Sequence, residues 1–409
     1  MIFKQKLVLL IFCTLILTFA NGQEMTTWNR TKISLANSKA VDTTLNVLQN
    51  TKSLENIFER LHQLKKNPEN KKVVFTHIGD SHIQADKMTA VLRNDLQTYF
   101  GNAGRGLLFP FQVAKTNGPS DVVSNSNTNW ASSRLSKLNV NVNCGIAAYG
   151  IKTALPSAEL TIAIKDSLKN SFDHVTLFFS KGLDRISFES ELFNDDLLLN
   201  MHSQMASITT PNAISKFKIK FGAAPDSAIE FFGLTVSKNN VSGIIYNAIG
   251  SNGAKLNDYN EAPLFWEQLP ELKTDCYIIS LGTNEAQNQN LTAELYTNNL
   301  KQMIEKIRNI SHDAPIIVVS PPVSYFKKVK SNKILAVISG AITNFCQLNN
   351  TAFFDLYTIS KGTRGAAVWR KLKLLNTDLV HFTNAGYTLQ ADLLLTAFAN
   401  AYNDYVAKK

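Results

Sequence analysis

The sequence is poor in cysteine, and its cysteines and histidines lack the spacings of known metal sites. Cys13 lies in the N-terminal apolar run, which leaves Cys144, Cys276 and Cys346 in the rest of the chain. None of them belongs to a Cys-x-x-Cys pair, and an odd number argues against a disulfide scaffold while leaving room for one bridge. No His, Cys and Asp cluster has metal-ligand spacing. We therefore expect no metal site, and buried, structural roles for Cys276 and Cys346.

The sequence also lacks a long apolar run after residue 20, which excludes a membrane span in the body of the protein. The exception is Leu7–Ala20, which follows Lys4 and Lys6 and ends at small residues. This pattern predicts a secretory signal peptide over residues 1–22, with an uncleaved N-terminal anchor as the alternative. The mature protein is then expected in the periplasm or outside the cell, with no integral membrane span.

No stripe of interleaved aromatic and basic residues is present, although the formal net charge is +10. The basic residues are scattered, with short clusters at Lys327–Lys330 and Arg370–Lys373. We therefore expect no nucleic-acid partner. Attraction to an anionic wall or membrane surface remains open, but a solvated basic face is the simpler interpretation.

The distribution of residue types along the chain predicts an α/β domain interrupted by an all-β module. Residues 23–70 form a helical lead-in, with apolar residues at helical spacing from Leu54 to Leu64. Residues 71–119 and 243–409 alternate apolar β-branched runs with helical patterns, which indicates a parallel sheet covered by helices on both faces. Residues 120–242 are rich in Asn, Ser and Thr and show short alternating segments, which favours an inserted β-sandwich.

Gly101–Gly106 is a glycine-rich loop that follows a predicted helix. A phosphate-binding loop would follow a strand and carry a Gly-Lys-Ser/Thr sequence, and neither condition is met. We expect this loop to lie at the rim of the active site instead.

The stretch from Val73 to Ser81 combines a buried strand with a turn that carries a serine. Gly79-Asp80 ends the strand, and the run from Ile83 to Leu92 predicts an amphipathic helix directly after it. A serine at such a turn has an exposed hydroxyl, and its N–H lies at a helix N-terminus, where partial positive charge favours an anion. Ser81 is therefore a candidate nucleophile, with a simple helix-capping role as the alternative.

Three later segments also lie near the C-terminal ends of predicted strands, where ligands of parallel sheets gather. Acyl transfer needs a nucleophile, a base, a group that orients the base, and donors for the developing oxyanion. His381 can be the base for Ser81, and Asp378, three residues earlier, can orient its imidazole. Gly253 permits close approach of a backbone N–H, and Asn284 offers a side-chain amide, so Ser81, Gly253 and Asn284 are the candidate oxyanion donors. Each residue alone has a structural alternative, namely a cap, a turn or a surface hydrogen bond.

This set of motifs resembles the SGNH (GDSL-like) hydrolases. The resemblance is carried by Gly79-Asp80-Ser81, Gly253, Gly282-Thr283-Asn284 and Asp378-x-x-His381. It implies a flavodoxin-like three-layer α/β/α fold and ester hydrolysis without a metal or other cofactor. It also implies a catalytic triad of Ser81, His381 and Asp378, with Ser81, Gly253 and Asn284 as the oxyanion hole. One position departs from the family pattern, because Glu285 stands where Asp is more usual. This departure leaves the candidate oxyanion donor Asn284 unchanged.

Within that family, the inserted β module resembles the jelly-roll insert of periplasmic peptidoglycan O-acetylesterases. The resemblance implies a secreted serine esterase that removes O-acetyl groups from a glycan, most often peptidoglycan. Three alternatives stay open: an acetylesterase of another polysaccharide such as xylan, an acetyltransferase, and a catalytically inert glycan-binding protein. We expect His77 to be buried, His82 to make a structural hydrogen bond, and Tyr387 and Trp369 to belong to the core.

Overall fold

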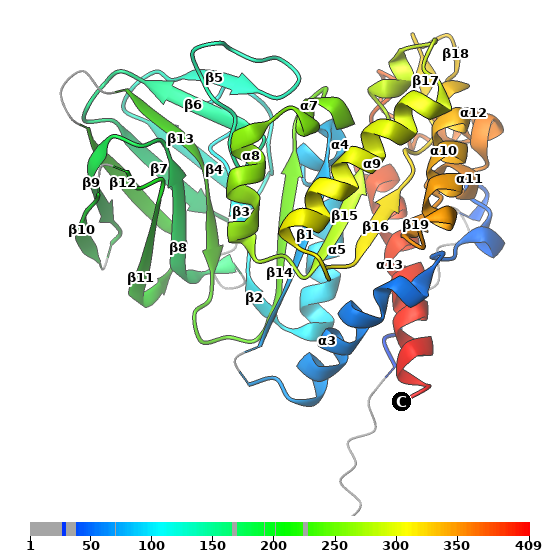
Figure 1. The fold of residues 1–409 in the computed structure, drawn as a ribbon, viewed down its shortest axis with the longest axis horizontal. Helices are drawn as coiled ribbons and strands as arrows, with labels where there is room; N and C mark the ends of the chain where they lie inside the picture. Colours follow the sequence, from blue (N-terminus) through cyan, green and yellow to red (C-terminus); the bar gives the residue numbers. More distant parts are fainter. Residues whose placement is uncertain are drawn as a thin grey trace, which may run out of the picture.

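The computed structural model in Figure 1 describes most of the chain after the predicted signal peptide. The described residues are 27–29, 38–69, 71–165, 170–191, 193–200, 202–223 and 228–409. The predicted signal peptide, residues 1–22, lies outside these ranges. Within them, no helix combines the length and the hydrophobicity needed to cross a membrane.

A six-stranded parallel sheet forms the centre of the molecule. Its spatial order is β19, β16, β15, β1, β14 and β2, and every neighbouring pair is parallel. All residues of β1 after Lys72 are buried, as expected for a central strand whose two faces are both covered. The strands are β1 (Lys72–Gly79), β2 (Asn102–Gly104), β14 (Gly243–Gly250), β15 (Cys276–Ser280), β16 (Ile316–Val319) and β19 (Ala352–Phe354).

Helices enclose this sheet in two groups (Figure 1). One group packs α3, α5 and α13 together, and the other joins α7, α9 and α10. The α-helices are α3 (Glu55–Lys66), α4 (Ser81–Gln84), α5 (Lys87–Phe100), α7 (Leu256–Asn260), α8 (Pro263–Gln268), α9 (Ala293–Ile310), α10 (Ile334–Leu348), α11 (Leu356–Ile359), α12 (Gly362–Lys371) and α13 (Asn384–Val406). Short 3₁₀ helices are η1 (Thr43–Leu45), η2 (Thr51–Leu54), η3 (Leu269–Leu272) and η4 (Glu285–Gln287), and a small hairpin joins β17 (Tyr325–Phe326) to β18 (Lys330–Ser331).

An antiparallel module lies beside the parallel sheet (Figure 1). One sheet has the order β10, β9, β12, β7 and β4, and the second has the order β11, β8, β13, β6 and β5, with β3 paired to β13. The strands are β3 (Gly106–Leu108), β4 (Val122–Ser126), β5 (Ala131–Arg134), β6 (Tyr149–Thr153), β7 (Glu159–Ile164), β8 (Phe172–Phe179), β9 (Leu183–Glu189), β10 (Asn194–Leu198), β11 (Met205–Ile214), β12 (Lys216–Ala223) and β13 (Ile229–Ser237). The predicted fold class, a flavodoxin-like α/β/α domain with an added all-β module, is confirmed.

The glycine-rich segment 101–106 is not the rim loop that the sequence analysis predicts. Its residues form β2, at the edge of the parallel sheet, and begin β3, which pairs with β13 of the antiparallel module. Gly104 has φ +144°, and a Cβ there would lie 2.5 Å from the Cα of Ser237. Glycine is therefore needed because two backbones meet where the chain passes from one sheet to the other.

Most predicted helices and strands of the α/β part lie where the sequence places them. The apolar pattern over Leu264–Leu269 predicts a helix closed by Pro270, yet α8 ends at Gln268 and Pro270 is the second residue of the next turn, η3. Proline fits there because the first helical N–H groups have no partner within the helix. The exact domain limits, with an insert at 120–242, stay a prediction; β3 lies before that range although it pairs with β13.

Candidate active site

The turn after β1 presents Ser81 at the C-terminal edge of the parallel sheet. Asp80 caps α4, because its side chain accepts a hydrogen bond from the His82 N–H at 2.9 Å. Helix α4 then begins at Ser81 itself. It runs close against β14, where a Cβ at Gly250 would lie 2.1 Å from the backbone nitrogen of Gln84. Close packing of the helix on the sheet therefore fixes the serine at the edge.

The single helix that the sequence predicts from Ile83 to Leu92 is interrupted. Helix α4 ends at Gln84, and α5 starts at Lys87, with Asp86 between them in the left-handed region at φ +55°. Asp and Asn tolerate this region better than most residues do. The interruption separates the short helix that carries Ser81 from the long helix that packs on α13.

Ser81, His381 and Asp378 form a continuous hydrogen-bonded relay. The Ser81 Oγ lies 2.8 Å from the His381 Nε2, although the two residues are 300 positions apart. The His381 Nδ1 lies 2.7 Å from the Asp378 Oδ2. The Asp378 Oδ1 accepts the backbone N–H groups of Val380 and His381 at 2.9 and 2.8 Å, which fixes the carboxylate.

The surroundings of Asp378 favour its charged form. Partial burial raises its pKa, but the hydrogen bonds from the Val380 N–H and from His381 outweigh that effect, and the pKa of Asp378 is lowered. A carboxylate can only accept hydrogen bonds, so the His381 Nδ1 must carry the proton. The His381 Nε2 is then an acceptor for the Ser81 hydroxyl, which is the tautomer that general-base catalysis requires.

The three predicted oxyanion donors lie in the same cleft as this relay. A cleft of about 870 Å³ is lined by Ser81, Gly253, Asn284, Asp378 and His381 among other residues. Gly253 has φ +84°, a conformation that favours glycine. The five residues predicted from separate parts of the sequence are thus brought together around one space.

Asn284 is more constrained than the sequence indicates. Its Nδ2 donates to the Ala254 carbonyl oxygen at 3.0 Å and to the Asp80 Oδ2 at 3.3 Å. An amide nitrogen has two protons, so both are engaged. An oxyanion bound here would replace the longer contact, the one to Asp80.

Two carboxyl groups are buried behind the nucleophile. Burial raises the pKa of Asp80 to about 7 and that of Glu285 to about 7. The Glu285 Oε1 accepts the Leu256 N–H at 2.7 Å, while its Oε2 is buried without a hydrogen-bond partner. Burial thus favours the neutral, protonated form of both groups.

The structural roles expected for the other histidines and aromatic residues are confirmed. His77 is buried between Tyr246 and Ser280, and its ring nitrogens lie 2.8 and 2.6 Å from their hydroxyl oxygens. The His82 Nδ1 lies 2.9 Å from the Tyr387 hydroxyl oxygen. Burial lowers the pKa of both histidines to about 3, so neither is charged at neutral pH. Trp369 is fully buried, and Tyr387 is buried with one edge on the cleft.

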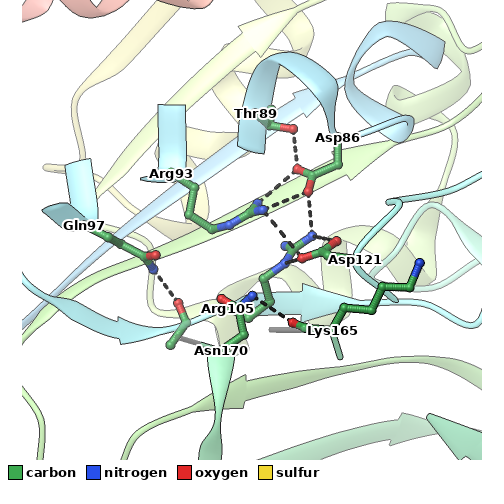
Figure 2. Close-up of polar contacts among 9 residues, drawn as sticks. Asp86, Thr89, Arg93, Gln97, Arg105, Asp121, Lys165 and Asn170 are labelled. Carbon is green, nitrogen blue, oxygen red and sulfur yellow. Dashed lines mark hydrogen bonds and ion pairs between the residues drawn. The ribbon is translucent and has the colours of Figure 1, made fainter. Parts of the chain in front are cut away.

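Figure 2 shows a group of four charged side chains beside the cleft that the sequence does not predict; Asp86, Arg93 and Arg105 are buried, and Asp121 is partly exposed. Both Arg93 terminal nitrogens bind the Asp86 carboxylate at 3.0 and 2.9 Å, and the Arg105 Nη2 binds it at 2.6 Å. The Arg105 Nε also binds Asp121, at the start of the antiparallel module, at 2.8 Å. Burial alone would raise the pKa of Asp86, but the attraction of Arg105 and Arg93 lowers it to about 2. No local pattern marks this group, because its members lie in four different segments.

The antiparallel module contributes to the cleft. Ser120 and Arg134 line the same space as the catalytic candidates. Among the described residues, no group of three or more His, Cys, Asp or Glu side chains is arranged to hold a metal ion. Cys144, Cys276 and Cys346 are free and buried.

The comparisons with known proteins agree with this geometry. The model of the GDSL-like Lipase/Acylhydrolase family matches residues 224–389, which include Gly253, Asn284 and His381. No curated protein matches the sequence significantly. A solved structure of a peptidoglycan O-acetylesterase matches with a TM-score of 0.73 and 20% identity, over 85% of this chain and 96% of that chain.

Two further solved structures match parts of the chain more weakly. A family two carbohydrate esterase from Cellvibrio japonicus has a TM-score of 0.30 and 11% identity, over 70% of this chain and 99% of that chain. An acetylxylan esterase mutant from Geobacillus stearothermophilus has a TM-score of 0.30 and 17% identity, over 38% of this chain and 73% of that chain. Residues 224–389 thus match the GDSL-like Lipase/Acylhydrolase family, and the chain shares the fold of the first structure.

Proposed function

We propose that this protein is a secreted serine esterase that removes O-acetyl groups from a glycan, with O-acetylated peptidoglycan as its substrate. The observation that carries the proposal is the Ser81–His381–Asp378 relay, with hydrogen bonds of 2.8 and 2.7 Å, in a cleft that Gly253 and Asn284 also line. The fold shared with a peptidoglycan O-acetylesterase supports the choice of substrate. Export rests on the sequence of residues 1–22 alone.

The proposed reaction runs through an acetyl-enzyme. The Ser81 Oγ attacks the acetyl carbonyl carbon while the His381 Nε2 takes the hydroxyl proton. The carbonyl oxygen becomes an oxyanion and receives hydrogen bonds from the Ser81 N–H, the Gly253 N–H and the Asn284 amide. The C–O bond to the sugar then breaks, and His381 returns its proton to the sugar oxygen. Water, activated by His381, releases acetate and restores Ser81.

Acetate release from O-acetylated muropeptides by the purified protein tests this proposal. Ser81→Ala removes the nucleophile, so the rate should fall by several orders of magnitude, as it does when triads are disrupted elsewhere. Ser53→Ala changes a serine that does not line the cleft and serves as the matched control.

Three results would contradict the proposal. If wild type and Ser81→Ala release acetate at the same rate, the mechanism is wrong. Release of acetate from acetylated xylan but not from muropeptides would show that the substrate is a xylan-type polysaccharide and not peptidoglycan. No turnover of any acetyl ester, together with retained glycan binding, would indicate an inert binding protein.

A further inference from the structure

The cleft is lined by more positive than negative side chains that are free to bind a ligand. Four charged side chains line it, namely Asp86, Lys87, Arg134 and Asp378, together with the His381 imidazole. Asp378 is held by His381, and Asp86 is held by Arg93 and Arg105 in the buried group of Figure 2. Both anions are therefore committed to other partners, and Lys87 and Arg134 remain as cations.

Among the described residues, the Arg134 guanidinium has no acidic partner, although a partly buried arginine usually has one. Its Nε is buried and has no hydrogen-bond partner. In the described part of the chain, no acidic side chain forms an ion pair with its guanidinium. Buried donors are normally satisfied, so an unpaired one at the wall of a cleft invites an acceptor from a ligand. The planar fork of a guanidinium matches a carboxylate, which can accept two parallel hydrogen bonds from it.

The segment that carries Arg134 contacts the loop that carries Gly253, one of the proposed oxyanion donors. Arg134 ends β5, and two residues later the Ser136 hydroxyl donates to the carbonyl oxygen of Asn252, the neighbour of Gly253. A Cβ at Gly253 would lie 3.0 Å from the Ser136 Oγ, so the two segments are in contact. In Figure 1, β5 lies at the same end of the molecule as α4 and α7. The antiparallel module therefore holds the positive charge of Arg134 at the wall of the cleft that Ser81 also lines.

Lys87 adds a second, more mobile positive charge. It begins α5 and is exposed, and its Nζ lies 5.9 Å from the centre of the Tyr387 ring. Tyr387 lines the cleft as well. An exposed ammonium on a flexible stem steers an anion more than it orients one.

We propose that Arg134, assisted by Lys87, forms a subsite for a carboxylate on the acetylated glycan. The subsite makes the enzyme selective for anionic acetylated glycans over neutral ones such as acetylated xylo-oligosaccharides. This inference rests on the proposed esterase function and names the substrate class of the same cleft. In peptidoglycan, the carboxylate comes either from the stem peptide or from the lactyl group of a strand that has lost its peptide.

The test compares Arg134→Met with wild type on four acetyl esters. The esters are peptide-bearing O-acetylated muropeptides, O-acetylated glycan strands stripped of peptide, acetylated xylo-oligosaccharides and 4-nitrophenyl acetate. Loss of a charge-assisted contact should lower kcat/KM by about 10- to 100-fold on the esters that carry the recognised carboxylate, mainly through KM. This fold-decrease in kcat/KM should be at least about ten times the fold-decrease that Arg134→Met causes on the two neutral esters.

The two carboxylate-bearing substrates separate the sources of the charge. A larger loss on muropeptides assigns the carboxylate to the stem peptide, and a larger loss on stripped strands assigns it to the lactyl group. Lys137→Met is the matched control, because Lys137 lies on the same hairpin, is exposed and does not line the cleft. Arg134→Lys keeps the charge without the fork, so it should recover part of the selectivity if Arg134→Met folds poorly.

Failure of the subsite and failure of the esterase function give different results. If wild type releases acetate from anionic glycans and Arg134→Met loses equally on anionic and neutral esters, the subsite is wrong and the esterase function stands. Equal kcat/KM of wild type on neutral and anionic glycans also overturns the subsite. If wild type hydrolyses no glycan ester, the proposed function fails and the subsite fails with it.

Discussion

At the scale of single residues, the site combines side chains whose neighbours favour opposite protonation states. Asp378 is held charged by its hydrogen bonds, and its pKa is lowered. Asp80 and Glu285, buried behind the nucleophile, have pKa values raised to about 7. Glu285 stands where Asp is more usual in the family, and its unpaired Oε2 shows that the longer side chain fits at the cost of a polar atom without a partner.

The raised pKa of Glu285 predicts a pH dependence of stability. The folded protein holds this proton up to about pH 7, whereas the unfolded chain releases it near 4.5. The unfolded state binds fewer protons in that interval, so the contribution of Glu285 makes the free energy of unfolding fall as pH rises from about 4.5 to 7. Glu285→Gln cannot ionise, so its stability relative to wild type should rise between pH 5 and pH 8, on the order of 1–3 kcal/mol.

Urea denaturation of both proteins at pH 5 and pH 8 measures this difference. The exposed Glu294→Gln, in the first turn of α9, controls for the removal of one carboxylate. A stability difference between Glu285→Gln and wild type that is the same at both pH values would show that Glu285 keeps an ordinary pKa.

Among the elements, the charges in Figure 2 link the α4–α5 junction, the β2–β3 junction and the start of the antiparallel module. Asp86 lies between α4 and α5, Arg93 on α5, Arg105 between β2 and β3, and Asp121 at the start of the antiparallel module. Asp86 also lines the cleft. The group therefore sets the position of α5 against the junction between the two sheets.

Removing one arginine from this charged group should lower the free energy of unfolding. Arg105→Met removes one of the two arginines that pair with both Asp86 and Asp121 and leaves buried charge partly uncompensated, so the free energy of unfolding should fall by about 3–5 kcal/mol. Lys301→Met breaks the exposed pair with Glu305, both 61% exposed, and should cost less than about 1 kcal/mol. Chemical denaturation at pH 7 gives both values. Equal costs for the two variants would mean that the buried group contributes no more than a surface pair.

At the scale of the whole molecule, the two sheet systems share one core. A single cluster of buried apolar residues contains Phe75 and Phe398 of the α/β part together with Phe217 and Phe231 of the antiparallel module. Polar contacts also cross the boundary, because the Tyr149 hydroxyl donates to the Gln84 Oε1 at 2.9 Å and the Ile146 N–H to the Gln268 Oε1 at 2.8 Å. Gln84 belongs to the same short helix as Ser81, so the module also supports the helix that carries the candidate nucleophile.

A shared core predicts that both parts unfold together. Differential scanning calorimetry should show one transition, with near-UV and far-UV circular dichroism melting at the same temperature. Two separated transitions would show that the antiparallel module is an independent unit that only packs against the α/β part.

Much of the α/β part was predictable because it depends on short-range patterns. A buried β-branched run such as Val73–Ile78 predicts a strand, and the helical spacing over Ile334–Leu348 predicts a helix; both patterns are local, and both elements form there. The segment 101–106 was misassigned because its glycines resemble a loop, whereas their role is to let two sheets approach each other. The break at Asp86 was missed because its cause, the pairing of that carboxylate with Arg93 and Arg105, is not local.

Short motifs are enough to indicate the candidate catalytic residues, because the hydroxyl, imidazole, carboxylate and amide side chains and the turns around them are local features. The folded chain adds that the Ser81 hydroxyl and the His381 imidazole lie 2.8 Å apart, that the Asn284 amide is shared with Asp80, and that an arginine of the antiparallel module lines the cleft. The physical reason is that motifs depend on neighbours along the chain, whereas contacts between distant segments depend on how sheets and helices pack to bury their apolar faces.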